Sequence, residues 1–427
     1  MTDKVVVSQL GARMHYAVPR IFASAGRLAH FYTDICATKG WPRIVTSFPS
    51  TLYPAPVKRL AGRLPKGVPT ALTTVFSSFG LRSVLRHMRT KDVVEETSHA
   101  IWAGSLFSEM VARRGFHGAA GLYAFSGDAL EQMRAAKQQG LWTAVEQMIA
   151  PRDVVETLLA QEMTRFPAWA NQVRDNPHAR IFADREKAEW RLADVIVCPS
   201  EFVRKHVVAC GGPEDRCVVV PYGVNPVPAI DRRTRMPGPI RVLTVGEVGL
   251  RKGSPYVVEA ARLMNGAARF RMAGRVRLPD EVKKQISQWV ELRGIVPRSQ
   301  IAEEFRWADV FLLPSLCEGS ATAVYEALAA GLPVITTENT GSVVRDGIDG
   351  FIVPVCDPQA IAAAVLELAD NPELRQIMSA NAFLRAAEHT VESYGERLLA
   401  ALPGPHLPRS ADLCLTDEAR YSGSIQT

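Results

Sequence analysis

The chain has 427 residues, of which 47% are hydrophobic and 22% charged, the balance of an ordinary soluble globular protein. This balance excludes a disordered or collagen-like chain, and the length predicts two domains, or three at most. No apolar run approaches the roughly 18 residues that a membrane span needs, and the start of the chain is too short in apolar residues for a signal peptide.

The cysteines indicate a reducing compartment. There are seven, an odd number, with no Cys-x-x-Cys pair, and several lie inside apolar runs. Reduced core thiols fit this pattern better than disulfides or a zinc site. We therefore expect a cytoplasmic protein.

The net charge of +6 is unevenly distributed. Residues 1–100 contain 14 Lys and Arg against 5 Asp and Glu, whereas the rest of the chain contains 36 against 39. Most of the excess lies between Lys58 and Lys91, where cations alternate with Leu, Val and Phe. This pattern predicts a basic amphipathic surface for an anionic lipid, a phosphorylated acceptor or a nucleic acid. The alternative is a solvated helix face with no specific partner.

Strand-like runs alternate with amphipathic segments of helical length, which predicts parallel sheets with helices on both faces. In the first half we expect strands at 5–10, 43–48, 121–125, 141–145, 195–198 and 216–220. Helices are expected at 16–28, 184–193 and 201–210. The many turn formers between 221 and 239 predict a linker.

A second series of strands begins at residue 240. Strands are predicted at 240–245, 268–272, 290–293, 310–313, 333–337 and 350–355, with helices opening near Ser254, Pro279, Ser299, Ser320 and Pro358. Six such units make a complete doubly wound domain. The predicted fold class is therefore α/β, with two Rossmann-like doubly wound domains facing across a cleft. The predicted boundaries are an N-terminal Rossmann-like domain at 1–225, a linker at 226–239, a C-terminal Rossmann-like domain at 240–390, a helix at 391–402 crossing back to the N-terminal domain, and a flexible tail at 403–427.

The most informative segment runs from 317 to 335. A strand ends at Pro314, a loop carries Glu318 and Gly319, and Ser320 is predicted to begin a helix with Glu326 nearly two turns inside. The unpaired amides and positive dipole end of such a helix suit a pyrophosphate.

Helical spacing places Thr322, Ala323 and Glu326 on one face, with Glu326 about 9 Å from the predicted helix start. A carboxylate there can accept from two ribose hydroxyls while the phosphates lie on the helix end. Glu318, at the rim, can accept from hydroxyls beyond the phosphates. This arrangement predicts a nucleotide-sugar pocket; a surface Glu and a loop Glu without function are the alternative.

A cationic loop after the first strand of the second series is expected at the same cleft. Arg251 and Lys252 lie between glycines and precede a good helix start at Ser254 and Pro255. Loops at the carboxyl ends of parallel strands face one crevice, so both cations can neutralise a diphosphate from the side opposite the helix. By itself, an Arg-Lys-Gly turn would be ordinary surface.

Together these motifs resemble the GT-B fold retaining glycosyltransferases of family 4, the glycosyl transferases group 1. The resemblance rests on Glu318 and Glu326 as an ExxxxxxxE signature, the Arg251-Lys252-Gly253 loop, and the segments 193–200, 221–224, 292–297, 327–335 and 346–350.

The resemblance implies roles for individual residues. Glu318 would bind hydroxyls of the donor sugar, Glu326 the ribose, and the amides of Ser320 to Ala323 the distal phosphate. Gly294, Ile295 and Val296 would flank the base.

The sequence departs from the family pattern in two places. Glu247 stands where many members carry an Arg, and no His occurs from 118 to 177, where many members present one toward the sugar. Gly11, Arg13 and His15 stand in the position of a flexible glycine loop near donor and acceptor. We take them as a candidate substrate loop, with a His of no function as the alternative.

The predicted activity is retaining transfer of a sugar from a nucleotide diphosphate sugar to a saccharide or lipid-linked acceptor, in bacterial surface polysaccharide or glycolipid synthesis. The leaving diphosphate would accept the acceptor's proton, with its growing charge stabilised by Arg251, Lys252 and the helix near 320. No cofactor and no metal are expected, since no DxD-like site is apparent, and peripheral contact with the inner membrane surface is expected.

Two rivals remain open. One is another GT-B activity such as a nucleotide-sugar epimerase; the other is a non-catalytic nucleotide-sugar-binding protein. Nucleic-acid binding is least favoured, because the basic region lacks the aromatic and glycine patterns of RNA modules.

Overall fold

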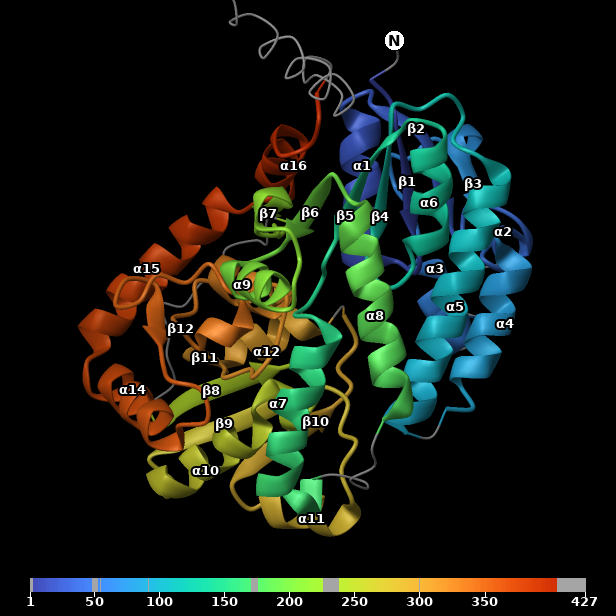
Figure 1. Ribbon diagram of the computed structural model, residues 1–427. Helices are drawn as coiled ribbons and strands as arrows, with labels where there is room; N and C mark the ends of the chain where they lie inside the picture. The colour runs from blue at the N-terminus through green and yellow to red at the C-terminus, as the bar shows by residue number, and fades with distance from the viewer. Residues whose placement is uncertain are drawn as a thin grey trace, which may run out of the picture.

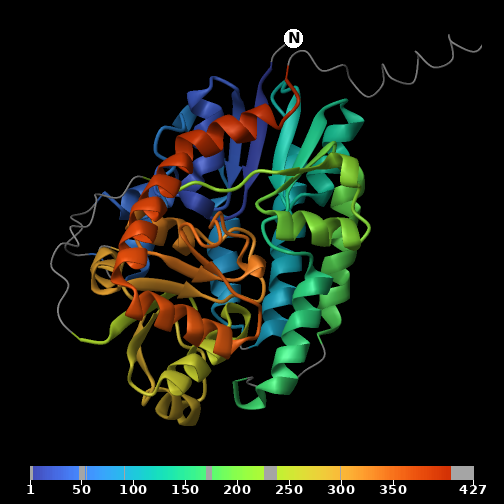
Figure 2. The same cartoon turned by 90° about the vertical axis from the view of Figure 1, so that its left-hand side faces the viewer.

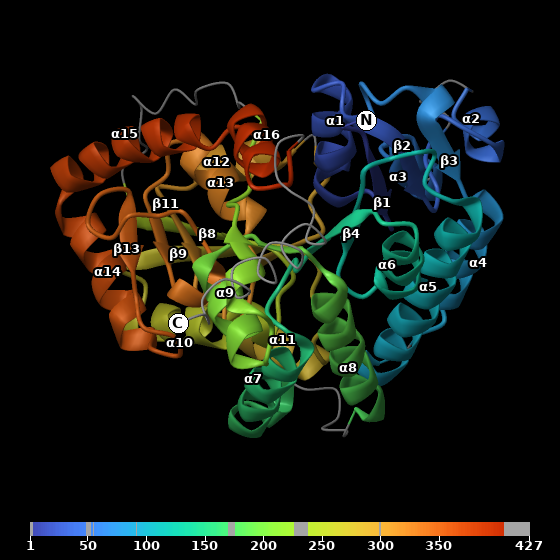
Figure 3. The same ribbon diagram turned by 45° about the horizontal axis from the view of Figure 1, so that its top comes forward.

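The computed structural model describes residues 3–47, 53, 55–90, 92–169, 176–225, 238–298 and 300–404. Within these residues the chain forms two parallel sheets with helices packed on both faces (Figure 1). The two halves lie side by side as separate lobes (Figure 3). The predicted α/β fold with two doubly wound domains is therefore confirmed. The predicted linker lies outside the described residues except for 238 and 239, as does the predicted tail except for 403 and 404.

The N-terminal sheet has seven strands in the described part of the chain. From one edge to the other they are β3 (Thr73–Val75), β2 (Leu28–Thr33), β1 (Val5–Gln9), β4 (Gly121–Phe125), β5 (Trp142–Glu146), β6 (Val195–Cys198) and β7 (Cys217–Val219), all parallel. The helices of this half are α1 (Ala17–Ser24), α2 (Trp41–Val45), α3 (Ala55–Ala61), α4 (Ser77–His87), α5 (Val93–Arg114), α6 (Leu130–Gln138), α7 (Arg152–Arg165), α8 (Pro177–Leu192) and α9 (Glu201–Ala209).

The C-terminal sheet has six described strands, and each lies where the sequence predicts one. Their order is β10 (Val290–Gly294), β9 (Ala268–Ala273), β8 (Ile240–Val245), β11 (Val310–Leu313), β12 (Val334–Thr336) and β13 (Gly350–Ile352). The helices are α10 (Ser254–Met264), α11 (Asp280–Ile286), α12 (Ile301–Trp307), α13 (Thr322–Ala329), α14 (Pro358–Asp370), α15 (Pro372–Glu388) and α16 (Val391–Ala400). Among the helices described, none is both long and apolar enough to cross a membrane.

Side chains alternate between the two faces of each sheet and build separate cores. In β8, Val242 packs with one set of helices and Leu243 with the other. In β1, Val6 packs into one core while Val5 and Val7 pack into the opposite one. Strands buried on both faces explain the near-continuous apolar runs that made these elements predictable.

Two N-terminal predictions were wrong. The strand expected at 43–48 begins as helix α2, because Gly40, with φ 70°, turns the chain and Pro42 occupies the first helical turn. The helix expected at 16–28 ends at Ser24, because Gly26 adopts φ 68° and starts a turn into β2. Strands β2 and β3 were not predicted.

Two helices join the halves. Helix α16 returns to the N-terminal domain and packs on α1, where Gly395 faces Ile21 (Figure 2). Helix α7, although it follows β5, docks on the C-terminal domain: the Tyr256 hydroxyl donates to Glu162 over 2.6 Å. One hydrophobic core accordingly contains residues from both sheets.

Candidate active site

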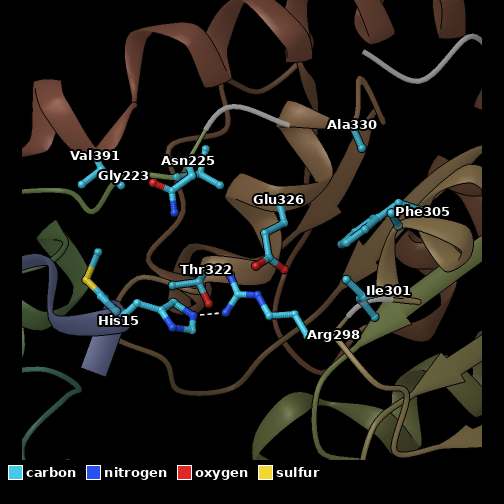
Figure 4. Close-up of a pocket in the computed structure, with 13 residues that line it drawn as sticks. His15, Gly223, Asn225, Arg298, Ile301, Phe305, Thr322, Glu326, Ala330 and Val391 are labelled. Carbon is cyan, nitrogen blue, oxygen red and sulfur yellow. Dashed lines mark hydrogen bonds between the residues drawn. The ribbon is translucent and has the colours of Figure 1, made fainter. Parts of the chain in front are cut away.

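A cavity of about 460 Å³ opens between the two domains (Figure 4). The N-terminal loop after β1, the segment before the linker, the β10–α12 connection and helices α12, α13 and α16 contribute its walls. The lining residues are Met14, His15, Gly223, Val224, Asn225, Arg298, Ile301, Ala302, Phe305, Thr322, Glu326, Ala330 and Val391. Predicted site residues His15, Thr322 and Glu326 therefore meet at one cavity.

Glu326 lies one turn inside α13, not two. The helix begins at Thr322 because the Ser320 hydroxyl turns inward and pairs with the Tyr325 hydroxyl at 2.6 Å. At about 1.5 Å rise per residue, Glu326 is about 6 Å from the helix start instead of about 9 Å. Thr322 and Glu326 both face the cavity (Figure 4). The carboxylate is thus close to the amides of the first helical turn, which have no partner earlier in the helix.

The charge state of Glu326 is set by two opposing effects. Burial raises the pKa of its carboxyl, and the nearby Arg298 guanidinium lowers it. Figure 4 shows both side chains pointing into the same space. A hydrogen-bond acceptor and a cation are therefore presented together at the cavity wall.

The loop after β1 holds an unusual backbone. Residues 14–16 have φ of 44, 52 and 60°, a left-handed run that costs side-chain-bearing residues roughly 1 kcal/mol or more each. The Gln9 amide donates to the carbonyls of Gly11 and Arg13, over 3.0 and 3.2 Å, and the Gly11 amide donates to Asp34. The strained turn directs His15 into the cavity, whereas Gly11 and Arg13 do not line it.

His15 contacts the opposite domain. Its Nε2 accepts a hydrogen bond from Arg298 Nη1 across the cavity (Figure 4). Burial lowers the pKa of His15, and Arg298 and Arg20 lower it further, which favours the neutral ring that can accept. The sequence did not single out Arg298; the available signal was a cation directly after the 292–297 motif.

The two predicted anion loops do come together. Arg251 Nη1 and Lys252 Nζ lie 2.5 and 2.9 Å from the same Glu318 oxygen. Gly253 makes the turn with φ 67°, and a Cβ there would lie 2.0 Å from the Pro314 carbonyl oxygen. Arg251, Lys252 and Glu318 form a compact ionic cluster, but none of the three lines the cavity.

The N-terminal domain packs so closely on residue 319 that only a glycine fits there. A Cβ on it would lie 1.7 Å from the Met148 carbonyl oxygen, and Ser200 Oγ donates to the Gly319 carbonyl over 2.6 Å. The sequence anticipated a close backbone approach here, and the chain's own backbone makes one. Donor contact by Gly319 stays a prediction.

The remaining predicted donor residues, Gly294, Ile295, Val296 and Ala323, do not line the cavity. Gly294 has φ 65°, and its carbonyl accepts from the Gly274 amide over 2.8 Å. Ile295 is 61% exposed, and Val296 packs partly against the core. Ala323 is half-buried in the first turn of α13. Donor contact by these four residues stays a prediction.

Two buried carboxyls, Asp128 and Glu146, lie in the stretch 118–177 of the N-terminal domain, which contains no His. Asp128 is buried with no hydrogen-bond partner at Oδ1, and burial raises its pKa to about 7 against the lowering effect of Arg13 and Arg185. Glu146 accepts from the hydroxyls of Tyr123 and Tyr222, at 2.5 and 2.6 Å. Sequence patterns gave no signal for either environment, because both depend on segments far apart in the chain.

Within the described ranges, no group of three or more His, Cys, Asp or Glu is arranged to hold a metal ion.

The C-terminal half has recognisable relatives. Residues 239–371 match the family of glycosyl transferases group 1. The matched stretch contains Arg251, Lys252, Glu318 and Glu326. The chain is 29% identical over 212 residues to an amylovoran biosynthesis glycosyltransferase of Erwinia amylovora, covering 45% of this chain and 50% of that protein. It is 28% identical over 230 residues to a putative colanic acid biosynthesis glycosyltransferase of Salmonella typhimurium, covering 49% and 55%. These matches span about half the length of the relatives.

Solved structures share the whole fold. An Anabaena protein, HepE, crystallised with UDP, superposes with a TM-score of 0.58 at 13% identity, covering 93% of this chain and 100% of that one. A glycosyltransferase from Rickettsia africae superposes with a TM-score of 0.57 at 14% identity, covering 93% and 97%. At such identities the likeness establishes the GT-B fold.

Proposed function

We propose that the protein is a glycosyltransferase that moves a sugar from a nucleotide diphosphate sugar to a saccharide or lipid-linked acceptor in surface polysaccharide synthesis. The observation that carries the proposal is Glu326, half-buried beside the N-terminal end of α13 in a cavity between two Rossmann-like domains. The group 1 match over this domain and the names of the polysaccharide-synthesis relatives support it.

The donor would lie along α13. A carboxylate one turn inside the helix suits two vicinal ribose hydroxyls, while the first-turn amides and the helix dipole favour a diphosphate. Arg251 and Lys252 are 2.5 and 2.9 Å from Glu318, so a diphosphate would compete with that carboxylate for both cations. Glu318 would then be released toward the donor sugar.

We propose a retaining and metal-independent reaction. The departing diphosphate takes the proton of the acceptor hydroxyl as the new bond forms on the same face of the sugar. The protein's contribution is to hold the reactants together and to stabilise charge growing on the diphosphate, on the order of 3 to 4 kcal/mol for a well-placed donor.

The N-terminal domain would supply the acceptor side. His15 reaches the cavity from its strained loop, opposite Glu326 (Figure 4). A lipid-linked acceptor would place the protein at the cytoplasmic face of a membrane, in peripheral contact with it.

The test is donor turnover with purified protein across UDP-, GDP-, ADP- and dTDP-sugars, first screened by thermal stabilisation. We expect one donor to stabilise the protein, Glu326→Gln to weaken that stabilisation, and Lys252→Met to lower turnover at least about 100-fold, as loss of a transition-state donor does. Arg262→Gln, on the exposed side of α10, is the matched cation control. Wild-type turnover in both site variants would contradict the proposal.

The products separate the rival functions. A new glycosidic bond with retained anomeric configuration supports the proposal. Conversion of the donor to its epimer would identify an epimerase, and tight donor binding without turnover of any acceptor would identify a binding protein.

A further inference from the structure

Helices α2 and α4 form a second surface feature, at the outer edge of the N-terminal domain (Figure 1). They enclose a groove of about 550 Å³ that the candidate active site does not use. We call it the α2–α4 groove; it is lined by Trp41, Ser78, Leu81, Arg82, Leu85, Arg86 and Arg89.

The groove belongs to a segment with one sign of charge. Between Asp34 and Asp92 the sequence contains ten Lys and Arg and no Asp or Glu. Arg82 and Arg86 lie one turn apart on α4, Arg89 follows in the turn after the helix, and all three are exposed. The described lining of the groove therefore carries three cations and no carboxylate, which complements an anionic partner.

Two of these guanidinium groups are held in place. Arg82 and Arg86 stack over the Trp102 ring of α5, at 5.2 and 4.6 Å from its centroid. Stacking uses the face of a guanidinium and leaves its N–H edge available, and this edge matches phosphate oxygens. The pair is thus ordered before any phosphate arrives.

An apolar stripe runs beside the arginines. Leu81, Leu85 and Met88 lie at positions i, i+4 and i+7 of α4 and its end, with 43, 51 and 75% of their surface exposed. On α2, Trp41 and Ile44 are 37 and 67% exposed. Large side chains on one exposed helix face next to a row of cations are typical of helices that lie in a membrane interface.

The segment that precedes α2 contacts the candidate substrate loop. Asp34, which opens the basic segment, accepts from the Gly11 amide of the substrate loop over 3.1 Å and pairs with Arg63 at 3.0 Å. The Tyr16 hydroxyl, at the end of the same loop, donates to the Ile35 carbonyl. A bilayer docked on α2 and α4 would therefore lie on the domain that carries the acceptor-side loop.

We infer that the α2–α4 groove and its exposed stripe dock the protein on a bilayer containing anionic phospholipid, with the arginines on lipid phosphates and the apolar side chains in the interface. The inference rests on the proposed function, because a lipid-linked acceptor gives the protein a reason to be at a membrane. Docking is measured without donor or acceptor, however, so either idea can fail without the other.

The experiment is co-sedimentation of the full chain with vesicles of phosphatidylglycerol and phosphatidylcholine, and with phosphatidylcholine alone. Wild type should partition onto the anionic vesicles and be released by salt. Removing both charges in Arg86→Gln/Arg89→Gln should lower partitioning about 30-fold, or about fivefold for each arginine. Leu85→Gln/Met88→Gln should lower it as well.

Matched variants control for exposure and charge. Ile377 and Leu384 on α15 are each 60% exposed, so Ile377→Gln/Leu384→Gln tests loss of apolar surface elsewhere. Arg113→Gln/Arg262→Gln removes two exposed cations, and both control pairs should sediment as wild type does.

Equal binding of wild type to both vesicle types would overturn the inference, as would an equal loss in the control pairs. So would wild-type binding by both groove variants. Stronger binding to a duplex DNA oligonucleotide than to anionic vesicles would assign the surface to nucleic acid instead. If a groove variant fails to fold, the dependence of wild-type binding on phosphatidylglycerol and on salt still tests whether the protein docks on anionic lipid.

Discussion

Replacing Gly319 by Ala isolates the contact between the candidate site and the N-terminal domain. The new Cβ would lie 1.7 Å from the Met148 carbonyl oxygen, where real contacts of this kind stay above 3.0 Å. The two backbones must therefore separate by more than about 1 Å. Overpacking of this kind costs typically 1–3 kcal/mol, and losing the Ser200 hydrogen bond to the Gly319 carbonyl costs about 1 kcal/mol more.

The separation acts on the loop that leads into α13. We expect Gly319→Ala to lose about 2–4 kcal/mol of unfolding free energy. It should also lose on the order of 100-fold in kcat/KM, because a misplacement near 1 Å in a positioning element has that effect.

Urea unfolding and donor turnover measure the two effects. Gly249→Ala is the control, since nothing lies within 4 Å of its added Cβ and its backbone is extended. Its stability should stay within about 0.5 kcal/mol of wild type. Wild-type stability and turnover in Gly319→Ala would refute the close packing described for this loop.

Three further predictions concern titratable groups. Burial raises the pKa of Glu326 and Arg298 lowers it, so donor affinity should fall as the pH drops through a pKa above the usual ~4.3. Arg298→Ala should move this fall in affinity to higher pH. Calorimetric titration of the donor across the acid range checks this, and an unmoved pH profile would contradict it. Asp128 has a pKa of about 7 when folded against ~3.9 when unfolded, so its contribution to the unfolding free energy is complete at low pH and is lost as pH rises toward 7. Asp128→Asn should therefore become more stable than wild type across that pH range, by on the order of 4 kcal/mol. Parallel pH profiles of stability for the two proteins would contradict this. Tyr222→Phe removes one of the two hydroxyls bonded to the buried Glu146 and should lower the unfolding free energy by about 1.5–3 kcal/mol in urea titrations; a loss under about 0.5 kcal/mol would show that the hydroxyl is dispensable.

The C-terminal sheet was predictable because its strands are buried on both faces. The run 310–313 is apolar throughout and 240–245 is largely so, and they end at a proline and a glycine, so pattern and structure agree. The strands of the N-terminal half were harder to predict from the sequence. Strand β2 carries the polar His30 between its apolar residues, and only the short turn at Gly26 separates the strand from α1.

The candidate site was predictable where one segment carries it. Glu326 and Thr322 follow from helical spacing, and Arg251 and Lys252 from their loop. The helix start was misplaced by two residues because Ser320 bonds to Tyr325 instead of capping the helix. Arg298, which meets His15 from 283 positions away, depends on the arrangement of the two domains, which no local pattern encodes.

The core shared by the two sheets has a consequence for unfolding. Val5 and Val7 of β1 belong to the same buried cluster as Leu243 and Phe311 of the other sheet, and Tyr394 and Leu398 of α16 lie within it. Loosening either lobe would expose apolar surface of the other, so heating should produce one cooperative transition where two independent lobes would give two. A fragment of residues 1–225 would lack helix α16, which packs on α1. We expect such a fragment to be unstable because the apolar surface of α1 would be exposed to solvent.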